Sequence, residues 1–566
     1  MCLYRFTGNP FVDAGIAGMC AAAEVDRPED LSYENVRSAT QRLVGIFTSP
    51  QALKCGVGPG NSKASAFATR EMSVFFPNGP LANPSNNTAE KKREKYSSKI
   101  NELLSLLNLT CTSSMRCFVC GRYAHVVATK MDFPLVDSSD RRNFHPAHNP
   151  GHPVCAHCAL AVQFLPISTM RTSPNGGLFW FLSSLDPRVA IAPAAELVLP
   201  ELNNCIALNN RLRLYGDWEV PGKTSSAVVS ALVALSGKQR LLNLSEPEYP
   251  VRAFFFTNDN RNPRVSILEI PNYILRFIVR LRSIHRDSFN KFVNEALRLN
   301  GLCDAMLEGS QIAKKCVVFP DNENNYTELK GGWYAHALYM KEVLGMQDRY
   351  IKTIEDVALR IAESEDPLAE LKSIKVEKWP IQWFHRAIAK SFLTFDEFCL
   401  LVPENYYRNA SVALDYVTAA TADAIRCKTE NGEWKRWDGC ARESENNKHP
   451  IIQLVENIGD RVSGSSYDPK KLLNNLRIAR DEFLIRRAWL RALESGAIGW
   501  TDFVELVPPD NSHIVFTVRD YMIAYLCDKL RGSIEPEAIE ESEEAPDINL
   551  NIKNNNIEEE EEWPTL

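Results

Sequence analysis

The sequence has no long apolar run and no apolar leader. Its hydrophobic stretches, such as 227–235, are short, whereas a helix needs about 20 apolar residues to cross a bilayer. The N-terminus, MCLYRFTGNPFVD, lacks a basic segment followed by an apolar one, so we expect no secretory signal. We therefore expect a cytoplasmic protein without a membrane partner. Its fifteen cysteines should be reduced and free to bind metal.

Familiar catalytic signatures are also missing. The chain has no phosphate-binding GxxxxGK[ST] loop, no GxSxG and no HExxH. Gly56, Gly58 and Gly60 resemble a phosphate loop only superficially, because Pro59 interrupts them and no clear strand precedes them. We expect a protein that is not an enzyme.

Acidic excess is confined to the last stretch of the chain. The formal net charge is −7, but residues 534–566 alone carry twelve acidic residues and one lysine, which is −11. Without this stretch the body of the chain is at +4. The stretch is poor in apolar residues, so we predict a disordered acidic tail. The mildly basic body is compatible with nucleic-acid binding without requiring it.

Two CxxC pairs are the most specific motif. Cys117-Phe-Val-Cys120 and Cys155-Ala-His-Cys158 are separated by 34 residues. Each pair forms a tight turn that points two thiolates to one side, and Gly121 suits the first turn. Together the pairs predict a tetrahedral Zn²⁺ site. A closed site of four cysteines leaves no open position for water or substrate, so we expect the zinc to be structural.

Histidines gather around these pairs, which raises a catalytic alternative. Zinc-stapled nucleases also carry flanking CxxC pairs, and an HNH-like nuclease could use His145 or His148, close to Arg141 and Arg142. However, Phe144 stands where that class has an acidic residue, and ALAVQFLP follows Cys158 where it has Asn or His. We favour a loop packed around the zinc. One histidine acting as a substitute ligand is the third alternative.

The periodicity predicts a multidomain α+β protein. A zinc-stapled N-terminal region with a small β-hairpin sheet should precede an all-α C-terminal helical bundle. Asn9 and Pro10 form an N-cap and N1 pair, before apolar residues at helical spacing. The turn NDNRN lies between two strand patterns and predicts a hairpin over 251–270. The predicted parts are 1–110, helical with Gly/Asn-rich loops; 111–166, the zinc segment; 167–345, an α+β domain; 346–533, the bundle; and 534–566, the tail.

The predicted bundle contains an internal repeat. Residues 386–419 align without gaps to 491–524, with nine identities in 34 positions that include F-x-x-L-V-P and a later D-Y pair. We interpret the two segments as related helical modules, the alternative being chance similarity of amphipathic helices.

Three groups of basic residues are candidates for phosphate contact. The first group is Lys91, Lys92 and Arg93 in a predicted helix 90–107, and the second is Arg276 and Arg280 on the polar face of a helix after Pro271. The third is a stripe at helical spacing, Arg477, Arg480, Arg487 and Arg491. The alternative is a solvated helix face, partly paired with Asp481 and Glu482.

Several phrases resemble a known family. They are YRFTGNPFVDAG at Tyr4, FFPNGPLANPS at Phe75, the CFVCG and CAHC pairs, and VRAFFFTNDNRNPRVSILEIPNYILRFI at Val251. Together they are similar to the CXXC–CXXC-containing large subunit of type I-B CRISPR Cascade, over most of the first 300 residues. The acidic tail does not map onto that family.

The resemblance implies a non-catalytic subunit beside the other Cascade backbone subunits, at the crRNA 5′ end. It would read the protospacer-adjacent motif of target double-stranded DNA, support R-loop formation, and recruit an effector helicase–nuclease or a transposition adaptor. Because amide side chains pair with base edges, we predict that Lys63, Asn78, Asn83 or Asn86 lies near the opened duplex.

The resemblance also implies a separate small subunit made by internal initiation, for which Met346 is the candidate start. A zinc-ribbon scaffold without direct nucleic-acid contact is a further alternative.

Overall fold

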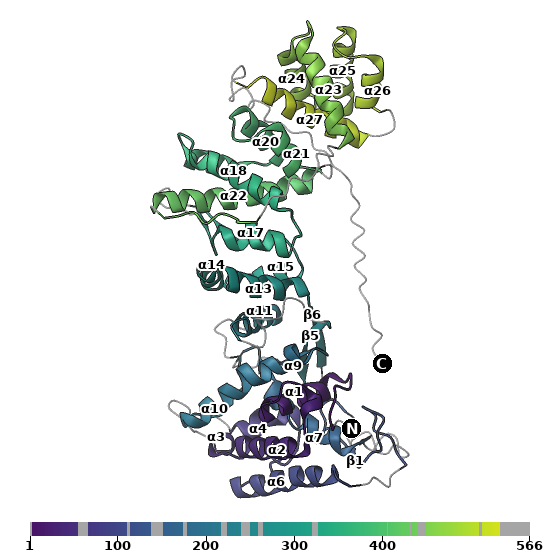
Figure 1. Ribbon diagram of the computed structural model, residues 1–566, viewed down its shortest axis with the longest axis vertical. Coiled ribbons are helices and arrows are strands. Elements are labelled where there is room, and N and C mark those ends of the chain that lie inside the picture. The colour runs from purple at the N-terminus through teal and green to yellow at the C-terminus, as the bar shows by residue number, and fades with distance from the viewer. Residues whose placement is uncertain are drawn as a thin grey trace. The chain divides into compact units, whose positions relative to one another are not determined.

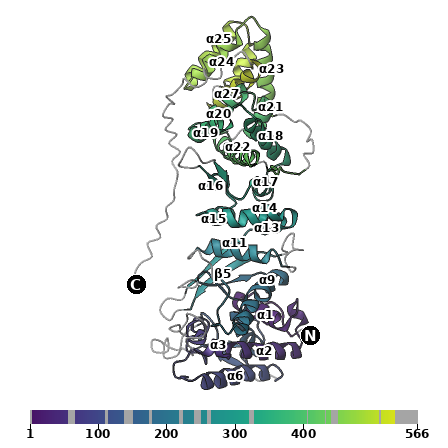
Figure 2. The same cartoon turned by 90° about the vertical axis from the view of Figure 1, so that its left-hand side faces the viewer.

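The computed structural model describes residues 3–54, 66–109, 114–136, 151–173, 178–216, 223–238, 249–258, 264–319, 327–403, 406–430, 432–439, 449–508 and 512–531. The chain divides into two compact units, shown with their elements in Figures 1 and 2. The first comprises 1–318 with 330–346, and the second comprises 319–329 with 347–566. The predicted acidic tail lies outside the described residues.

The first unit combines helices with short antiparallel strands. Its strands are β1 (Val126–Ala128), β2 (His152–Val154), β3 (Met170–Arg171), β4 (Phe179–Ser183), β5 (Val251–Thr257), β6 (Arg264–Ile270) and β7 (Val317–Val318). Its helices are α1 (Pro10–Ala23), η1 (Pro28–Asp30), α2 (Tyr33–Phe47), α3 (Pro50–Leu53), α4 (Phe67–Arg70), α5 (Met72–Phe75), α6 (Ala89–Leu106), α7 (Ala156–Val162), α8 (Leu165–Ser168), α9 (Pro187–Pro193), η3 (Ala194–Val198), α10 (Leu199–Ala207), α11 (Thr224–Leu235), α13 (Asn272–Ile284), α14 (Arg286–Lys291), η4 (Phe292–Ala296), α15 (Leu302–Leu307), α16 (Ala313–Cys316) and α17 (Trp333–Glu342).

Helix α1 is a central packing element of this unit. The predicted cap is confirmed, since the Asn9 side chain accepts from the first free N–H groups and Pro10 occupies the first helical position. Almost the whole helix is buried, not one face alone, because α2, α7, α8 and α9 all contact it. Gly15 and Gly18 permit such close packing. A Cβ atom at Gly15 would stand 2.1 Å from the carbonyl oxygen of Ala161 in α7.

A four-stranded antiparallel sheet in the order β3-β4-β5-β6 packs against α1. The predicted hairpin is confirmed as β5 and β6, which pair from Val251–Ile270 to Thr257–Arg264. Aromatic pairs join β4 to β5, with Phe181 stacked on Phe254 and Trp180 on Phe255. Phe11 of α1 meets Phe181 edge-on at 5.3 Å between ring centroids. The predicted α+β class is therefore confirmed.

In its described residues the second unit contains β8 and ten helices. The first five helices are α18 (Asp348–Ala362), α19 (Pro367–Val376), α20 (Pro380–Ala389), α21 (Phe395–Leu401) and α22 (Tyr406–Thr429). The next five are α23 (Pro450–Gly464), α24 (Pro469–Ile478), α25 (Glu482–Glu494), α26 (Trp500–Leu506) and α27 (Ser512–Lys529), and β8 covers Glu328–Leu329.

The two sets of five helices follow the same plan, and we call them the first and second modules. Helices α21 and α26 both begin and end 105 residues apart, which is the offset of the sequence repeat. The long final helix of each module packs on its first, α22 on α18 and α27 on α23. Positive φ at Ser391 and at Gly496 places the same left-handed turn before α21 and α26.

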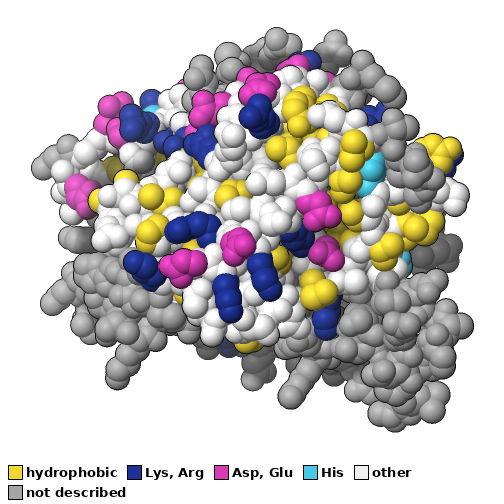
Figure 3. All heavy atoms as spheres, turned by 90° about the horizontal axis from the view of Figure 1, so that it is seen from below, with side chains coloured by type: hydrophobic (Ala, Val, Ile, Leu, Met, Phe, Trp, Pro, Cys, Tyr) yellow, Lys and Arg dark blue, Asp and Glu magenta, His cyan; other side chains and the backbone are white. Residues whose placement is uncertain are grey.

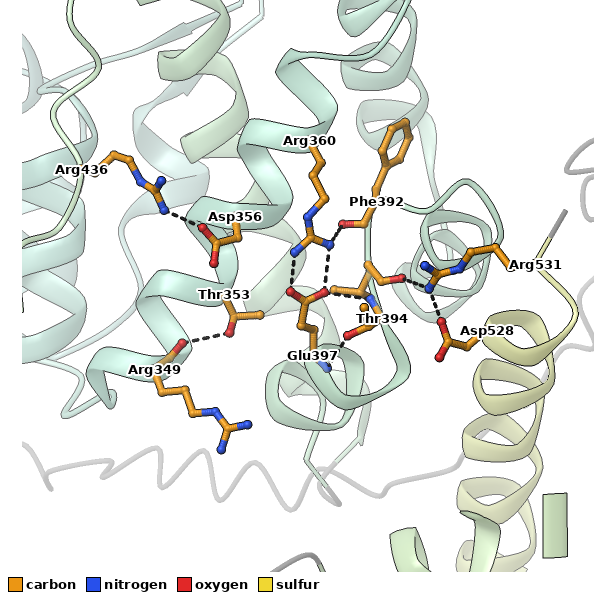
Figure 4. A network of polar contacts seen from close by, with 11 residues as sticks. Arg349, Thr353, Asp356, Arg360, Phe392, Thr394, Glu397, Arg436, Asp528 and Arg531 are labelled. Atoms are coloured by element: carbon orange, nitrogen blue, oxygen red, sulfur yellow. Dashed lines mark hydrogen bonds and ion pairs between the residues drawn. The ribbon is translucent and has the colours of Figure 1, made fainter. Parts of the chain in front are cut away.

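Polar contacts repeat in the same places. Arg360 of α18 forms a two-pronged ion pair with Glu397 in the first turn of α21, and also reaches the carbonyl oxygen of Phe392 (Figure 4). Arg461 of α23 pairs at 2.7 Å with Asp502 in the first turn of α26. The likeness therefore extends beyond the two aligned segments to five helices in each module.

Within the described parts of the chain, no helix is both long enough and apolar enough to span a bilayer.

Candidate metal centre

The first CxxC pair lies in a tight turn before β1. The Cys117 N–H donates to the carbonyl oxygen of Arg122 at 2.7 Å, and the Gly121 N–H donates back to Cys117 at 3.0 Å. Gly121 has φ +73°, a left-handed conformation that favours glycine. Next along the chain, β1 and β2 form an antiparallel pair that leads to the second CxxC. The turn thereby holds both thiols of the first pair on one side.

The second CxxC pair opens helix α7. Cys155 is the N-cap, and its sulfur accepts from the N–H of Cys158 at 3.4 Å. The Phe118 N–H donates to Pro153 at 3.0 Å, which ties the first turn to the strand before Cys155. Since α7 packs against α1, this pair is fixed to the core of the first unit.

The four sulfur atoms converge. All lie within 4.8 Å of one another, and the sulfurs of Cys120 and Cys155 are 3.5 Å apart. In a tetrahedral site with Zn–S bonds of about 2.3 Å, sulfur atoms are about 3.8 Å apart. Three of the cysteines are buried and Cys120 is partly exposed. The donor set therefore fits a thiophilic ion in a closed site, as the spacing predicts.

The four thiols shift one another's pKa values. Interaction with the other three thiols, that of Cys120 first, lowers the pKa of Cys117. Interaction with Cys117 in turn raises the pKa of Cys155 and of Cys158. Four thiolates at this distance repel one another, so all four can ionise only around a cation. A bound metal ion would supply the largest local charge in such a site.

A cavity of about 580 Å³ borders Cys120 and Cys158. Tyr4, Arg122 and His157 are among its lining residues, and the Tyr4 hydroxyl and His157 Nδ1 are buried without a hydrogen-bond partner. Burial lowers the pKa of His157 to about 4, with Arg122 contributing. Our sequence prediction missed Tyr4 and Arg122 as neighbours of the site, since nothing in their spacing links 4 to 122.

The histidines of the nuclease alternative cannot be placed. His145 and His148, with Arg141 and Arg142, lie outside the described residues. His125 accepts a hydrogen bond from the Ala156 N–H through Nδ1, at 3.3 Å. Among the residues that the structure describes, the metal-binding cluster contains cysteines only.

Two of the asparagines predicted to lie near the opened duplex form hydrogen bonds within their own loop. Asn86 is buried and donates to the carbonyl oxygen of Pro80 at 2.7 Å, while the Asn83 side chain accepts from the Ser85 N–H at 2.8 Å. Asn78 is exposed, with φ +60°. Lys63 lies outside the described residues.

Of the three basic residues predicted in α6 as phosphate contacts, two form hydrogen bonds within the protein. Lys92 donates to Thr69 and Arg93 to the carbonyl oxygen of Thr48, whereas Lys91 is exposed. Figure 3, which views the molecule from the α6 end of Figure 1, shows basic side chains interspersed with acidic ones.

Arg276 and Arg280 of α13 share one acidic partner. The Glu342 carboxylate forms an ion pair with each of them, and its Oε2 atom is 2.7 Å from Arg276 Nε. The two arginines lie on the polar face of the helix, as predicted, because the other face is buried at Ile274, Leu275, Ile278 and Leu281.

The prediction of one continuous arginine stripe is wrong. Arg477 is in α24, Arg480 follows that helix, and Arg487 and Arg491 are in α25. The side chain of Asp481 accepts from the Leu484 N–H and caps a new helix, so helical spacing does not run through this point. Burial lowers the pKa of Arg477, whereas Arg487 and Arg491 are exposed.

Comparison with known proteins points to the cysteine segment. Residues 110–170 match a family model described as CRISPR-associated protein (Cas_CXXC_CXXC). The matched region contains all four converging cysteines. No curated protein and no solved structure matches the chain. The match supports a CRISPR-associated protein with paired CXXC motifs.

Proposed function

We propose that the chain is the non-catalytic large subunit of a type I-B-like CRISPR Cascade complex, with a structural Zn²⁺ ion held by Cys117, Cys120, Cys155 and Cys158. The observation that carries the proposal is the closed four-cysteine cage inside the segment that matches a CRISPR-associated family. Four sulfur ligands in a tetrahedral arrangement are the preferred set for structural zinc. The ion would hold the 117–121 turn against the start of α7.

In this role the protein would bind crRNA and the target duplex beside the backbone subunits, and read the protospacer-adjacent motif. Guide pairing would read the remaining sequence. Of the three asparagines near residue 80, Asn78 suits base contact best because it is exposed. The Asn86 side chain already donates a hydrogen bond to the loop carbonyl of Pro80. Recruitment of an effector helicase–nuclease or a transposition adaptor would follow R-loop formation.

A shorter product beginning at Met346 belongs to the same proposal. The chain passes from the first unit to the second at 346–347, so such a product would contain both five-helix modules. It would lack 319–329, which also belong to the second unit.

The test is co-expression of the tagged chain with a CRISPR array and its neighbouring backbone subunits. We expect crRNA to co-purify, and the complex to bind a matched duplex only when the correct flanking motif is present. The chain alone with Mg²⁺ should leave labelled DNA intact. Cleavage by the chain alone would favour the nuclease alternative. Absence of crRNA, with no salt-dependent DNA binding, would favour a scaffold.

A further inference from the structure

The cavity beside the cysteine cage is lined by both apolar and polar side chains. Its volume of about 580 Å³ lies within the range of about 300–1,000 Å³ that is usual for small-molecule sites. The residues that border it come from segment 3–7, helix α1, the first CxxC turn and the start of α7. Its apolar lining consists of Leu3, Phe6, Val12, Ile16 and Val119.

Two buried polar atoms beside this cavity have no hydrogen-bond partner among the described residues. Tyr4 is 3% exposed and its hydroxyl is unpaired, as is Nδ1 of His157. The two rings are neighbours, with centroids 5.6 Å apart and planes inclined by 59°. Buried polar groups in folded proteins are nearly always hydrogen-bonded, because an unpaired one costs free energy. The pair therefore indicates a ligand that supplies the missing hydrogen bonds.

Two arginines add positive charge to the same cavity. Arg122 is partly buried and Arg5 is exposed. Nη1 of Arg122 donates to the carbonyl oxygen of Leu3 at 3.2 Å, but a guanidinium has five N–H donors. Among the described residues, no carboxylate forms an ion pair with either arginine. The charge of the cavity favours an anionic ligand.

The ligand must satisfy the apolar lining, the two unpaired polar atoms and the arginines together. An acyl chain would leave the Tyr4 hydroxyl and the His157 nitrogen unpaired, and inorganic phosphate would leave the apolar lining uncovered. A nucleotide meets all three requirements. Its base is flat and carries donors and acceptors on the Watson–Crick edge, and its phosphate forms strong hydrogen bonds with arginine.

We propose that this cavity binds one unpaired nucleotide. The base would lie against Val12 and Ile16 and form hydrogen bonds with Tyr4 and His157, while the phosphate would meet Arg122. The inference rests on the proposed function, which supplies crRNA and target DNA as sources of the nucleotide. The recognition chemistry is the same for a nucleotide in either strand and for a free nucleotide.

The cysteine cage gives this site its shape. His157 lies between Cys155 and Cys158, and the carbonyl oxygen of Arg122 accepts from the Cys117 N–H at 2.7 Å. Two of the proposed nucleotide contacts are thus held by the two CxxC pairs. A structural ion in the cage would fix the distance between them.

The experiment treats the assembled complex, with crRNA and a matched duplex, with dimethyl sulfate. This reagent methylates the Watson–Crick edge of unpaired A and C, so the strands carry A or C at every unpaired position. The test variants are Tyr4→Phe and Arg122→Gln. We expect one protected nucleotide to become about tenfold more reactive in each variant, since a hydrogen bond that holds it is lost. The strand that contains this nucleotide identifies its source.

Two control variants match these changes. Tyr96→Phe also removes a buried hydroxyl without a partner, but in α6, and Arg116→Gln removes an exposed arginine of the zinc segment that does not line the cavity. Both should keep the native reactivity. Metal analysis and thermal unfolding of Tyr4→Phe should match the native chain, because the lost hydroxyl has no partner within the protein. Loss of zinc or stability in Tyr4→Phe, with raised reactivity throughout the strands, would show a structural role and overturn the proposal.

Equilibrium dialysis of the native chain with radiolabelled adenosine monophosphate tests the free nucleotide. Binding that falls about tenfold in both test variants would support the cavity as a site for a free nucleotide. Unchanged reactivity at every position, without such binding, would overturn the proposal while crRNA in the complex upholds the proposed function. If no crRNA co-purifies, the proposed function fails, and dialysis on the chain alone decides whether the cavity binds a nucleotide.

Discussion

Gly15 shows how one hydrogen atom can set the packing of α1. A methyl group there would overlap the carbonyl oxygen of Ala161 at 2.1 Å, and relief requires α1 and α7 to separate. We expect Gly15→Ala to destabilise the protein by about 1–3 kcal/mol, the usual cost of overpacking. Thermal unfolding of the purified chain measures it.

Gly45→Ala is the matched control for this change. Gly45 is also in a helix, α2, but a Cβ atom there meets nothing within 4 Å. Alanine should be neutral or stabilising by up to about 1 kcal/mol. Equal effects at Gly15 and Gly45 would contradict the close-approach argument.

Cys155 both binds the proposed ion and caps α7. Cys155→Ser should lose about one equivalent of zinc and unfold the segment around 114–162, since structural zinc contributes on the order of 10 kcal/mol of coupled binding and folding. Metal analysis and thermal unfolding give the two readouts. Cys205→Ser, at a buried thiol outside the cage, should keep its zinc. A Cys155→Ser protein with full zinc and unchanged stability would exclude the four-sulfur site.

At the level of single residues, the sequence predicts the metal centre well because the CxxC turn is local. Spacing alone places two thiols on one side of each turn, and a tetrahedral site is the closed arrangement that uses all four thiols as ligands. The loop near Asn83 and Asn86 behaves differently. An amide can bond to a base or to its own backbone, and the sequence does not distinguish these; here Asn86 bonds to Pro80.

At the level of elements, His385 makes the contact between α20 and α27 sensitive to acid. Burial first, and then Arg519, lowers the pKa of His385 to about 3. A base with a lowered pKa in the folded state gives stability that is complete above its unfolded pKa, near 6.5, and is lost as the pH falls toward 3. We expect a loss of about 1.4 kcal/mol per pH unit within that window.

Thermal unfolding at pH 7.5 and pH 5.5 tests this expectation. His385→Gln should be less stable at pH 7.5 but should lose less on acidification than the native chain. His513→Gln, at an exposed position in α27, should behave like the native chain. An identical pH dependence in the native and His385→Gln proteins would assign the effect to other groups.

The five-helix plan shows where sequence reasoning stops. The aligned segments 386–419 and 491–524 reveal the third to fifth helices of each module, because F-x-x-L-V-P and D-Y are identical. The first two helices keep only apolar character and a charge, such as Arg360 and Arg461, and shift in offset from 105 to 101. A gap of a few residues hides such a likeness, since packing constrains the shape of a side chain more than its identity.

The arginine stripe fails for a related reason. The positions from Arg477 to Arg491 do have helical spacing. However, the Asp481 side chain accepts a hydrogen bond from the Leu484 N–H and caps a new helix, so the spacing does not continue through this point.

At the level of the whole molecule, the arginines that remain exposed can be tested on nucleic acid. If Arg487 and Arg491 contact phosphates in the assembled complex, replacing both with Gln should weaken binding to every sequence alike. The slope of log affinity against log salt should fall by roughly 0.7–0.9 per lost contact. Filter binding at several salt concentrations measures this slope.

Arg37→Gln controls for the general loss of positive charge, because Arg37 is exposed on α2 in the other unit. Its slope should match that of the native complex. Identical slopes in all three complexes would show that Arg487 and Arg491 are solvated without touching the backbone.

The exposed Trp500 has one more consequence. Proteins built from stacked repeats stay soluble by ending in a capping repeat with a polar outer surface. Among the described residues, the second module has a tryptophan, Trp500, at the position where the first module has the buried Phe395. At this position the outer surface of the second module is therefore apolar, unlike that of a polar capping repeat, and Trp500 is 67% exposed.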